Sequence, residues 1–237
     1  MIVAEQKSSA ETRALIGDTK TFLVVGCGTC VTICFAGGSR EAAIVAASLR
    51  MSSKLNYHEV KVSDVTVQRQ CEYEYLEPIK DQVMNVEVVL SLGCGIGVQA
   101  IAEHFTDTWV IPGLNTTYLG MPLEQGVGAE RCAACGDGIL GLTGGICPIA
   151  RCAKSLLNGP CGGLGNGHCE ISPETPCVWH LIYDRLNSQG KLHQLMELQS
   201  LKNWKVYRDG EPRRVIRPDL PLTTDFTSEG LSHNEHD

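Results

Sequence analysis

The sequence predicts an α/β protein, in which a small parallel-sheet domain precedes an irregular Cys-rich metal-binding domain and a C-terminal helix with an extended tail. Three observations support this fold class. Apolar strand runs alternate with helical stretches over residues 21–112, glycines and prolines interrupt residues 126–180, and twelve cysteines occur among the 237 residues. Strands that alternate with helical patterns are typical of βαβ units and a parallel sheet.

Seven consecutive runs carry the alternation. The expected strands are FLVV, YHEVKVSDV, VEVVLSLG and WVIPG, and the helical runs between them are SREAAIVAASLRMSS, YLEPIKDQVMN and VQAIAEHF. Continuous Val and Leu runs indicate strands that are covered on both faces. We therefore expect an N-terminal extension, an α/β domain with a strand-end iron–sulfur site, a Cys-rich domain, a helical segment and an extended or disordered tail, at residues 1–20, 21–125, 126–180, 181–208 and 209–237.

A helix is expected after the Cys-rich segment. Thr175 and Pro176 have the residue types of an N-cap and a first helical position. Apolar residues then recur at helical spacing, at Val178, Leu181, Ile182 and Leu186. We expect this stripe to pack on the chain's own sheet, with a partner interface as the alternative.

Composition excludes some classes of function. The net charge of -7 and the aromatic content of 5% argue against a nucleic-acid surface, which requires clustered basic residues and stacking rings. No segment is apolar enough to span a membrane, and the start MIVAEQKSSAETR lacks the apolar core of a signal peptide. We expect a cytoplasmic protein without membrane insertion.

The cysteines indicate metal binding, because a reducing cytoplasm does not favour disulfides and a chain of this length does not need them. Five lie in the first half of the chain, at Cys27, Cys30, Cys34, Cys71 and Cys94. Seven lie in the second half, at Cys132, Cys135, Cys147, Cys152, Cys161, Cys169 and Cys177. This division predicts at least two separate sites.

The first set surrounds the expected strand ends, where open α/β sheets bind their ligands. A [4Fe–4S] cluster needs four thiolates, and the closely spaced Cys27, Cys30 and Cys34 are the strongest candidates. Cys94 is preferred over Cys71 as the fourth ligand because it directly follows a strand. The alternative for either is a buried thiol that only fills space. A dinucleotide is less favoured, since Val31 stands where the phosphate-binding fingerprint requires its third glycine.

The second set lies in a segment too rich in glycine and proline to build an ordinary core, so metal binding is expected to hold it together. The Cys132-x2-Cys135 spacing is able to serve either zinc or iron–sulfur, and Cys147-Pro148 is similar to the Cys-Pro step that ends ferredoxin-type cluster motifs. Seven thiols are more than one tetrahedral site needs, so one cluster together with one zinc site is a further interpretation. His168 is a candidate nitrogen ligand, although we expect it to be a surface residue.

Several strings resemble one family. CAACGDGILGLTGGICPIARCAKSLLNGPCGG, HCE, CVWHLIYDRL and the earlier GCGTCVTICFAGG are similar to the MetV family, the small iron–sulfur subunit of bacterial methylenetetrahydrofolate reductases. The likeness extends over residues 22–186. One departure is Gly138, which stands where the family's Cys-x2-Cys-x2-Cys run has its third cysteine.

The resemblance implies a non-catalytic subunit that carries one or two [4Fe–4S] clusters, with zinc as a further candidate. Such a subunit passes electrons to or from the FMN of a flavin-dependent catalytic partner, with ferredoxin or another electron-input protein as a second partner. A different class of function stays open, namely a zinc-stabilised docking subunit without redox activity. An enzyme with its own substrate in the crevice is the third and least supported possibility.

Overall fold

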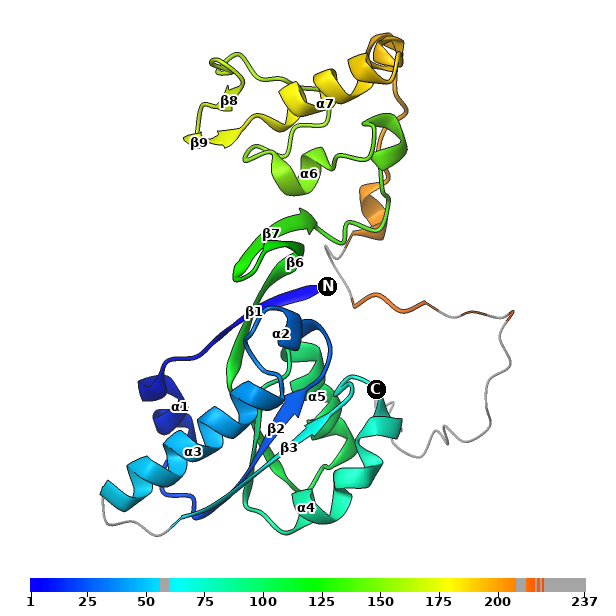
Figure 1. The fold of residues 1–237 in the computed structure, drawn as a ribbon. Helices are drawn as coiled ribbons and strands as arrows, with labels where there is room; N and C mark the ends of the chain where they lie inside the picture. The colour runs from blue at the N-terminus through cyan, green and yellow to red at the C-terminus, as the bar shows by residue number, and fades with distance from the viewer. Residues whose placement is uncertain (56–59, 208–211, 216, 218, 220–237) are drawn as a thin grey trace, which may run out of the picture.

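The computed structural model describes residues 1–55, 60–207, 212–215, 217 and 219. An α/β domain forms the lower part of Figure 1, the Cys-rich segment lies above it, and the hairpin of strands β6 and β7 joins the two. Most of the expected tail, residues 209–237, lies outside the described residues. Among the described residues, no helix combines the length and the apolar character needed to cross a membrane.

Four parallel strands form the sheet of the α/β domain in the order β3-β2-β4-β5. They are β2 (Thr21–Cys27), β3 (Lys61–Val67), β4 (Val88–Ser91) and β5 (Trp109–Pro112). The predicted alternation is thereby confirmed, since each strand corresponds to one of the four apolar runs. Because β2 and β4 are neighbours while the chain passes through β3 between them, the strand order reverses beside β2, which is where such sheets bind ligands.

Helices cover both faces of this sheet. On the left in Figure 1 lie α1 (Ser9–Ile16) and α3 (Ser39–Leu55), and on the right lie α4 (Lys80–Met84) and α5 (Gly95–His104). The side chains of β2 alternate accordingly. Phe22 and Val24 pack with Ala42 of α3, whereas Leu23 and Val25 pack with Ile101 of α5. Burial on both faces explains the continuous apolar runs of these strands.

A second, antiparallel sheet connects the N-terminus to the Cys-rich segment. It has the order β1-β6-β7, with β1 (Ile2–Gln6), β6 (Leu114–Glu124) and β7 (Val127–Cys132). The expected N-terminal extension therefore contributes one strand and one helix to the fold. The expected boundary between residues 125 and 126 falls inside the β6–β7 hairpin, so the chain passes between the two parts through a paired strand.

The Cys-rich segment contains little regular structure. Its elements are α6 (Pro148–Arg151), β8 (His168–Cys169), β9 (Ser172–Pro176) and α7 (Val178–Ser188). Elsewhere in the described residues, short 3₁₀ helices lie at Tyr73–Tyr75, Glu77–Ile79, Leu140–Leu142, Leu192–Met196 and Trp204–Val206. In the α/β domain, the four-residue helix α2 (Cys30–Ile33) follows β2.

The start of α7 differs from the prediction. Thr175 and Pro176 belong to β9, and Cys177 is the N-cap of the helix. The reason is strand pairing, because Pro176 lies opposite His168 and the Cys177 amide donates to the Gly167 carbonyl at 2.8 Å. These contacts hold the residues extended up to the N-cap.

The apolar stripe of α7 packs on its own chain, as expected, but not on the sheet. Val178, Trp179, Ile182 and Leu186 form a separate small core with Ile146 of the Cys-rich segment. This segment thus has a core of its own that is independent of the α/β domain.

Candidate metal centres

Three thiols lie at the carboxyl ends of three neighbouring strands. Cys27 is the last residue of β2, Cys71 follows the end of β3, and Cys94 follows β4 as the N-cap of α5. The strand register aligns these ends, since Cys27 lies opposite Val67. The thiols are therefore gathered at one edge of the sheet.

The Cys71 thiol lies within electrostatic range of Cys27 and Cys94. Desolvation raises the pKa of the Cys71 thiol, although the residue as a whole is exposed, and the charges of Cys27 and Cys94 raise this pKa further. Cys27 is buried, and Cys94 is half-buried. Three thiols so arranged could share one metal centre, because bound metal relieves the mutual repulsion of the thiolates.

The turn that carries Cys27 and Cys30 is fixed by backbone contacts. The Gly28 amide donates to the Val67 carbonyl at 2.9 Å, and the Thr32 hydroxyl donates to the Cys27 carbonyl at 2.7 Å. The Cys27 thiol lies 3.5 Å from the Thr29 hydroxyl. Cys30 begins α2 directly after this turn and is half-buried, three positions after Cys27.

Cys34 has different surroundings. Its thiol donates to the carbonyl oxygens of Ala4 and Val31, at 3.7 and 3.6 Å, and it packs against the core beneath α3. The contact with Ala4 directs this thiol to β1, whereas Cys71 follows the end of β3, beside the strand ends that carry Cys27 and Cys94. Which of the five proximal thiols bind metal stays a prediction.

A buried polar group that sequence reasoning missed supports the strand-end loops. The side-chain amide of Gln70, which is fully buried, donates to the Val25 carbonyl at 2.8 Å. Its oxygen accepts from the Ser91 hydroxyl at 2.6 Å, and that hydroxyl accepts from the Gly93 amide at 3.1 Å. One side chain thus ties the loop before Cys71 to the ends of β2 and β4. In the sequence, the feature that could have indicated this network is Ser91, a polar residue inside the apolar run VVLSLG.

We expect Gln70→Leu to lower the free energy of unfolding by about 1–3 kcal/mol, because the substitution leaves the buried Ser91 hydroxyl without its acceptor. Urea unfolding followed by far-UV circular dichroism measures the change. Gln82→Leu is the matched control, since Gln82 is exposed and surface substitutions usually stay within about 0.5 kcal/mol. Equal midpoints for the two variants would show that the Gln70 contacts contribute nothing.

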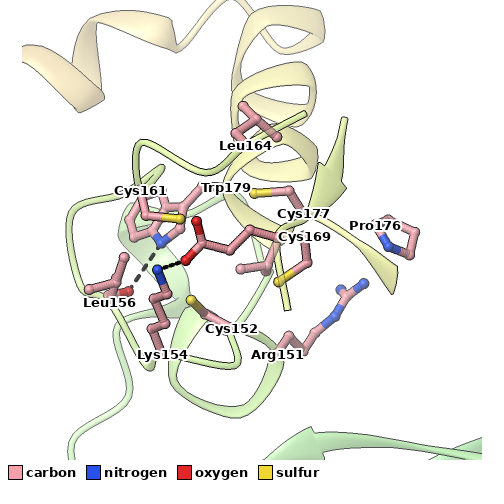
Figure 2. A pocket seen from close by; sticks show the side chains of 12 residues that line it. Arg151, Cys152, Lys154, Leu156, Cys161, Leu164, Cys169, Pro176, Cys177 and Trp179 are labelled. Carbon is pink, nitrogen blue, oxygen red and sulfur yellow. Dashed lines mark hydrogen bonds and ion pairs between the residues drawn. The ribbon is translucent and has the colours of Figure 1, made fainter. Parts of the chain in front are cut away.

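Four of the distal cysteines line one pocket, which Figure 2 shows from close by. They are Cys152, Cys161, Cys169 and Cys177, all half-buried. Around them lie Arg151, Lys154, Leu156, Leu164, Glu170, Pro176, Val178 and Trp179. Lys154 and Glu170 form an ion pair within this lining. His168 does not line this pocket; it is exposed, and its Nδ1 lies 3.1 Å from the Asn166 carbonyl.

The remaining three distal cysteines lie nearer to β7. Cys132 ends that strand and accepts from the Ala134 amide at 3.3 Å, and Cys147 caps α6 and accepts from the Ala150 amide at 3.5 Å. The buried Cys135 donates to the Asp137 carbonyl at 3.5 Å. Amides directed at sulfur are a feature of metal-thiolate sites, so these residues stay candidate ligands.

Within the described ranges, no group of three or more Cys, His, Asp or Glu side chains has the geometry to hold a metal ion as it stands. Metal binding at either cluster of thiols would therefore require the sulfurs to move closer together. Such movement is ordinary where metal binding is coupled to folding.

The fold and the placement of the thiols define an α/β domain joined to a small thiol-rich domain. Residues 111–205 match a family model described as Methylene-tetrahydrofolate reductase C terminal. This match supports a relation to methylenetetrahydrofolate reductase-type proteins, and it contains all seven distal cysteines and α7, while the strand-end thiols lie outside it. No curated protein and no solved structure shows a significant match to the chain.

Proposed function

We propose that this chain is the iron–sulfur electron-transfer subunit of a cytoplasmic methylenetetrahydrofolate reductase complex. In that complex it passes electrons to or from the FMN of a catalytic flavoprotein partner and does not itself carry out the folate chemistry. The observation that carries the proposal is the meeting of Cys27, Cys71 and Cys94 at the ends of three parallel strands.

We assign four thiols to one cluster, which the sulfurs would reach by moving closer together. Cys27, Cys71 and Cys94 supply three thiols, and Cys30 supplies the fourth from the start of α2, which completes the set that a [4Fe–4S] cluster requires. Cys34 is the less suitable fourth ligand because its thiol is directed at β1. A cluster bound there would supply one-electron transfer.

The protein's own residues would hold and shield this site. The Gln70 contacts fix the loop that carries Cys71, and the buried Val31 and Leu92 belong to the core that packs against α3. A Cβ atom at Gly37 would overlap the carbonyl oxygen of Leu92, so the loop after α2 can approach β4 only with glycine at this position. A rigid, partly dry setting lowers the reorganisation that accompanies electron transfer and sets the potential through burial and hydrogen bonds.

The relation of residues 111–205 to the reductase family supports the choice of partner. In the MetV-like arrangement that we propose, the distal domain carries a second metal centre, and a flavin-dependent reductase subunit binds the chain. Ferredoxin or another electron-input protein would deliver electrons to the strand-end cluster.

Electron passage is tested with the chain bound to its flavoprotein partner under anaerobic conditions. We expect the wild-type complex to exchange electrons between a low-potential donor and FMN, and the double variant Cys27→Ala, Cys30→Ala to fall to the rate of the partner alone. Stopped-flow absorbance of the flavin measures both. Unchanged flavin reduction in a double variant that still binds the partner would leave the chain as a docking subunit.

A further inference from the structure

We propose that a groove between α6 and α7 binds a small organic anion, whose phosphate or carboxylate groups lie between Arg151 and Arg185. This site is separate from the strand-end thiols and does not depend on the electron-transfer role. Three features point to it: the size of the groove, two arginines that face it without a carboxylate partner, and the apolar side chains beside them.

The groove lies where the end of α6 meets the second half of α7. Its lining consists of Ile146, Arg151, Leu181, Asp184, Arg185 and Ser188. Its volume is about 530 Å³, and sites for small molecules usually measure about 300–1,000 Å³. In Figure 1, α6 lies between β7 and α7, so the groove belongs to the distal domain alone.

The two arginines of the lining have no acidic partner. Among the residues that the structure describes, no carboxylate lies within ion-pair distance of Arg151 or Arg185. The Asp184 carboxylate, which also lines the groove, lies 3.5 Å from Nε2 of His180. In Figure 2 the Arg151 side chain extends away from the Lys154–Glu170 pair. Two guanidinium groups thus face the groove with donors available to a ligand.

The positive charges are gathered although the chain as a whole is acidic. Arg131 of β7 and Arg185 of α7 both lie within electrostatic range of Arg151, whereas the net charge of the chain is -7. Arginine stays charged in proteins, so the three side chains repel one another. Like charges held together cost free energy, and a bound anion would offset that cost.

Arg185 is held in position by the TGG turn. Its Nη1 donates to the Gly144 carbonyl at 3.3 Å. Gly144 has a φ of +62°, and a Cβ atom there would lie 2.7 Å from Cγ of Arg185. The arginine can therefore cross this turn only because the residue is glycine. A side chain fixed in this way loses little further freedom when a ligand binds, and one carbonyl occupies only one of its five N–H donors.

The lining also indicates the class of ligand. A guanidinium group presents a planar fork of donors that matches phosphate or carboxylate oxygens in pairs. Three arginines and the single Asp184 carboxylate leave a local charge of about +2, which a dianion balances. Ile146 and the half-buried Leu181 supply apolar surface beside the arginines. The lining therefore suits an organic phosphate or a dicarboxylate with an apolar body.

The first test is calorimetric titration of the full chain, purified without oxygen, with inorganic phosphate and with succinate, two anions that bind metals weakly. We expect the wild type to bind at least one of them, and the one that binds identifies the charged group. Arg151→Gln and Arg185→Gln should each weaken binding about tenfold or more, because each removes a charge-assisted contact. Arg40→Gln is the matched control, since Arg40 is an exposed arginine of α3 and should not matter.

Arg151 requires a separate outcome because it precedes Cys152 and lies within electrostatic range of Cys147. If Arg151→Gln abolished binding while Arg185→Gln bound like the wild type, Arg151 would serve the thiols and the proposed site would be wrong. Wild-type chain that binds neither probe would equally overturn it. Arg185→Lys keeps the charge without the fork and should retain part of the affinity, and far-UV circular dichroism shows whether each variant is folded.

A second measurement needs no variant. Phenyl phosphate should bind more tightly than inorganic phosphate, because its ring can cover Ile146 and Leu181. Hydrogen exchange of the wild-type chain should then slow in α7 (Val178–Ser188) when phenyl phosphate is added, and stay unchanged in β2 (Thr21–Cys27). Protection of β2 in place of α7 would locate the anion elsewhere and contradict the proposal, as would weaker binding of phenyl phosphate than of phosphate.

Discussion

Replacing Cys71 with serine is expected to remove the strand-end cluster, whereas replacing Cys34 with serine is expected to leave it in place. Both residues are free thiols near the same edge of the sheet, and the sequence alone favoured Cys34. The difference lies in their contacts. Cys71 follows the end of β3, beside the ends of β2 and β4 that carry Cys27 and Cys94, while the Cys34 thiol donates to the carbonyl of Ala4 in β1.

The measurement is iron and acid-labile sulfide per chain in each single variant, with visible absorption as the second readout. We expect Cys71→Ser to lose about four irons, as one [4Fe–4S] site requires, and Cys34→Ser to match the wild type. Far-UV circular dichroism confirms that both variants are folded. Iron loss in Cys34→Ser with retention in Cys71→Ser would reverse the ligand assignment.

The largest expected loss of stability follows from Trp179→Ala. Trp179 is 5% exposed in the small core of the distal domain, and its indole donates to the Leu156 carbonyl at 3.1 Å. A Cβ atom at Gly159 would overlap the indole ring, so the loop packs directly on it. Truncation of such a residue leaves a cavity and an unpaired carbonyl, which together cost about 3–5 kcal/mol.

Hydrogen exchange of the α7 amides and urea unfolding of the full chain measure this effect. We expect faster exchange in α7 and Ile146 with unchanged exchange in β2 and β4, because the two cores are separate. Tyr183→Ala is the matched control, since Tyr183 lies on the same helix and is 46% exposed. An effect of equal size in both variants would contradict the packing described for Trp179.

Much of the α/β domain follows from the sequence, because its strands are continuous apolar runs. Burial on both faces imposes that pattern, and FLVV and VEVVLSLG accordingly became the adjacent strands β2 and β4. The position of Cys27 and Cys94 at strand ends follows from the same pattern. The strand order β3-β2-β4-β5 then brings Cys71 to the same edge, which residue spacing alone does not show.

The features that sequence reasoning missed depend on contacts between distant residues. Gln70 is buried only because Val25 and Ser91 meet it from two other strands. The first turn of α7 begins late because Pro176 pairs with His168 across a hairpin. The four-thiol pocket likewise combines segments whose spacing of seven and eight intervening residues fits no compact metal motif. In each case the local sequence pattern is weak, and contacts between distant residues determine the structure.

The most direct measurement is an anaerobic count of iron, acid-labile sulfide and zinc on this chain copurified with its natural flavoprotein partner. An iron–sulfur electron-transfer subunit with a cluster at the strand ends should hold about four irons and four sulfides per chain there, and the double variant Cys27→Ala, Cys30→Ala should lose that iron while the zinc remains. A native complex with zinc but neither iron nor sulfide in this chain would contradict the electron-transfer role. Electrons would then have to reach the flavin by another route.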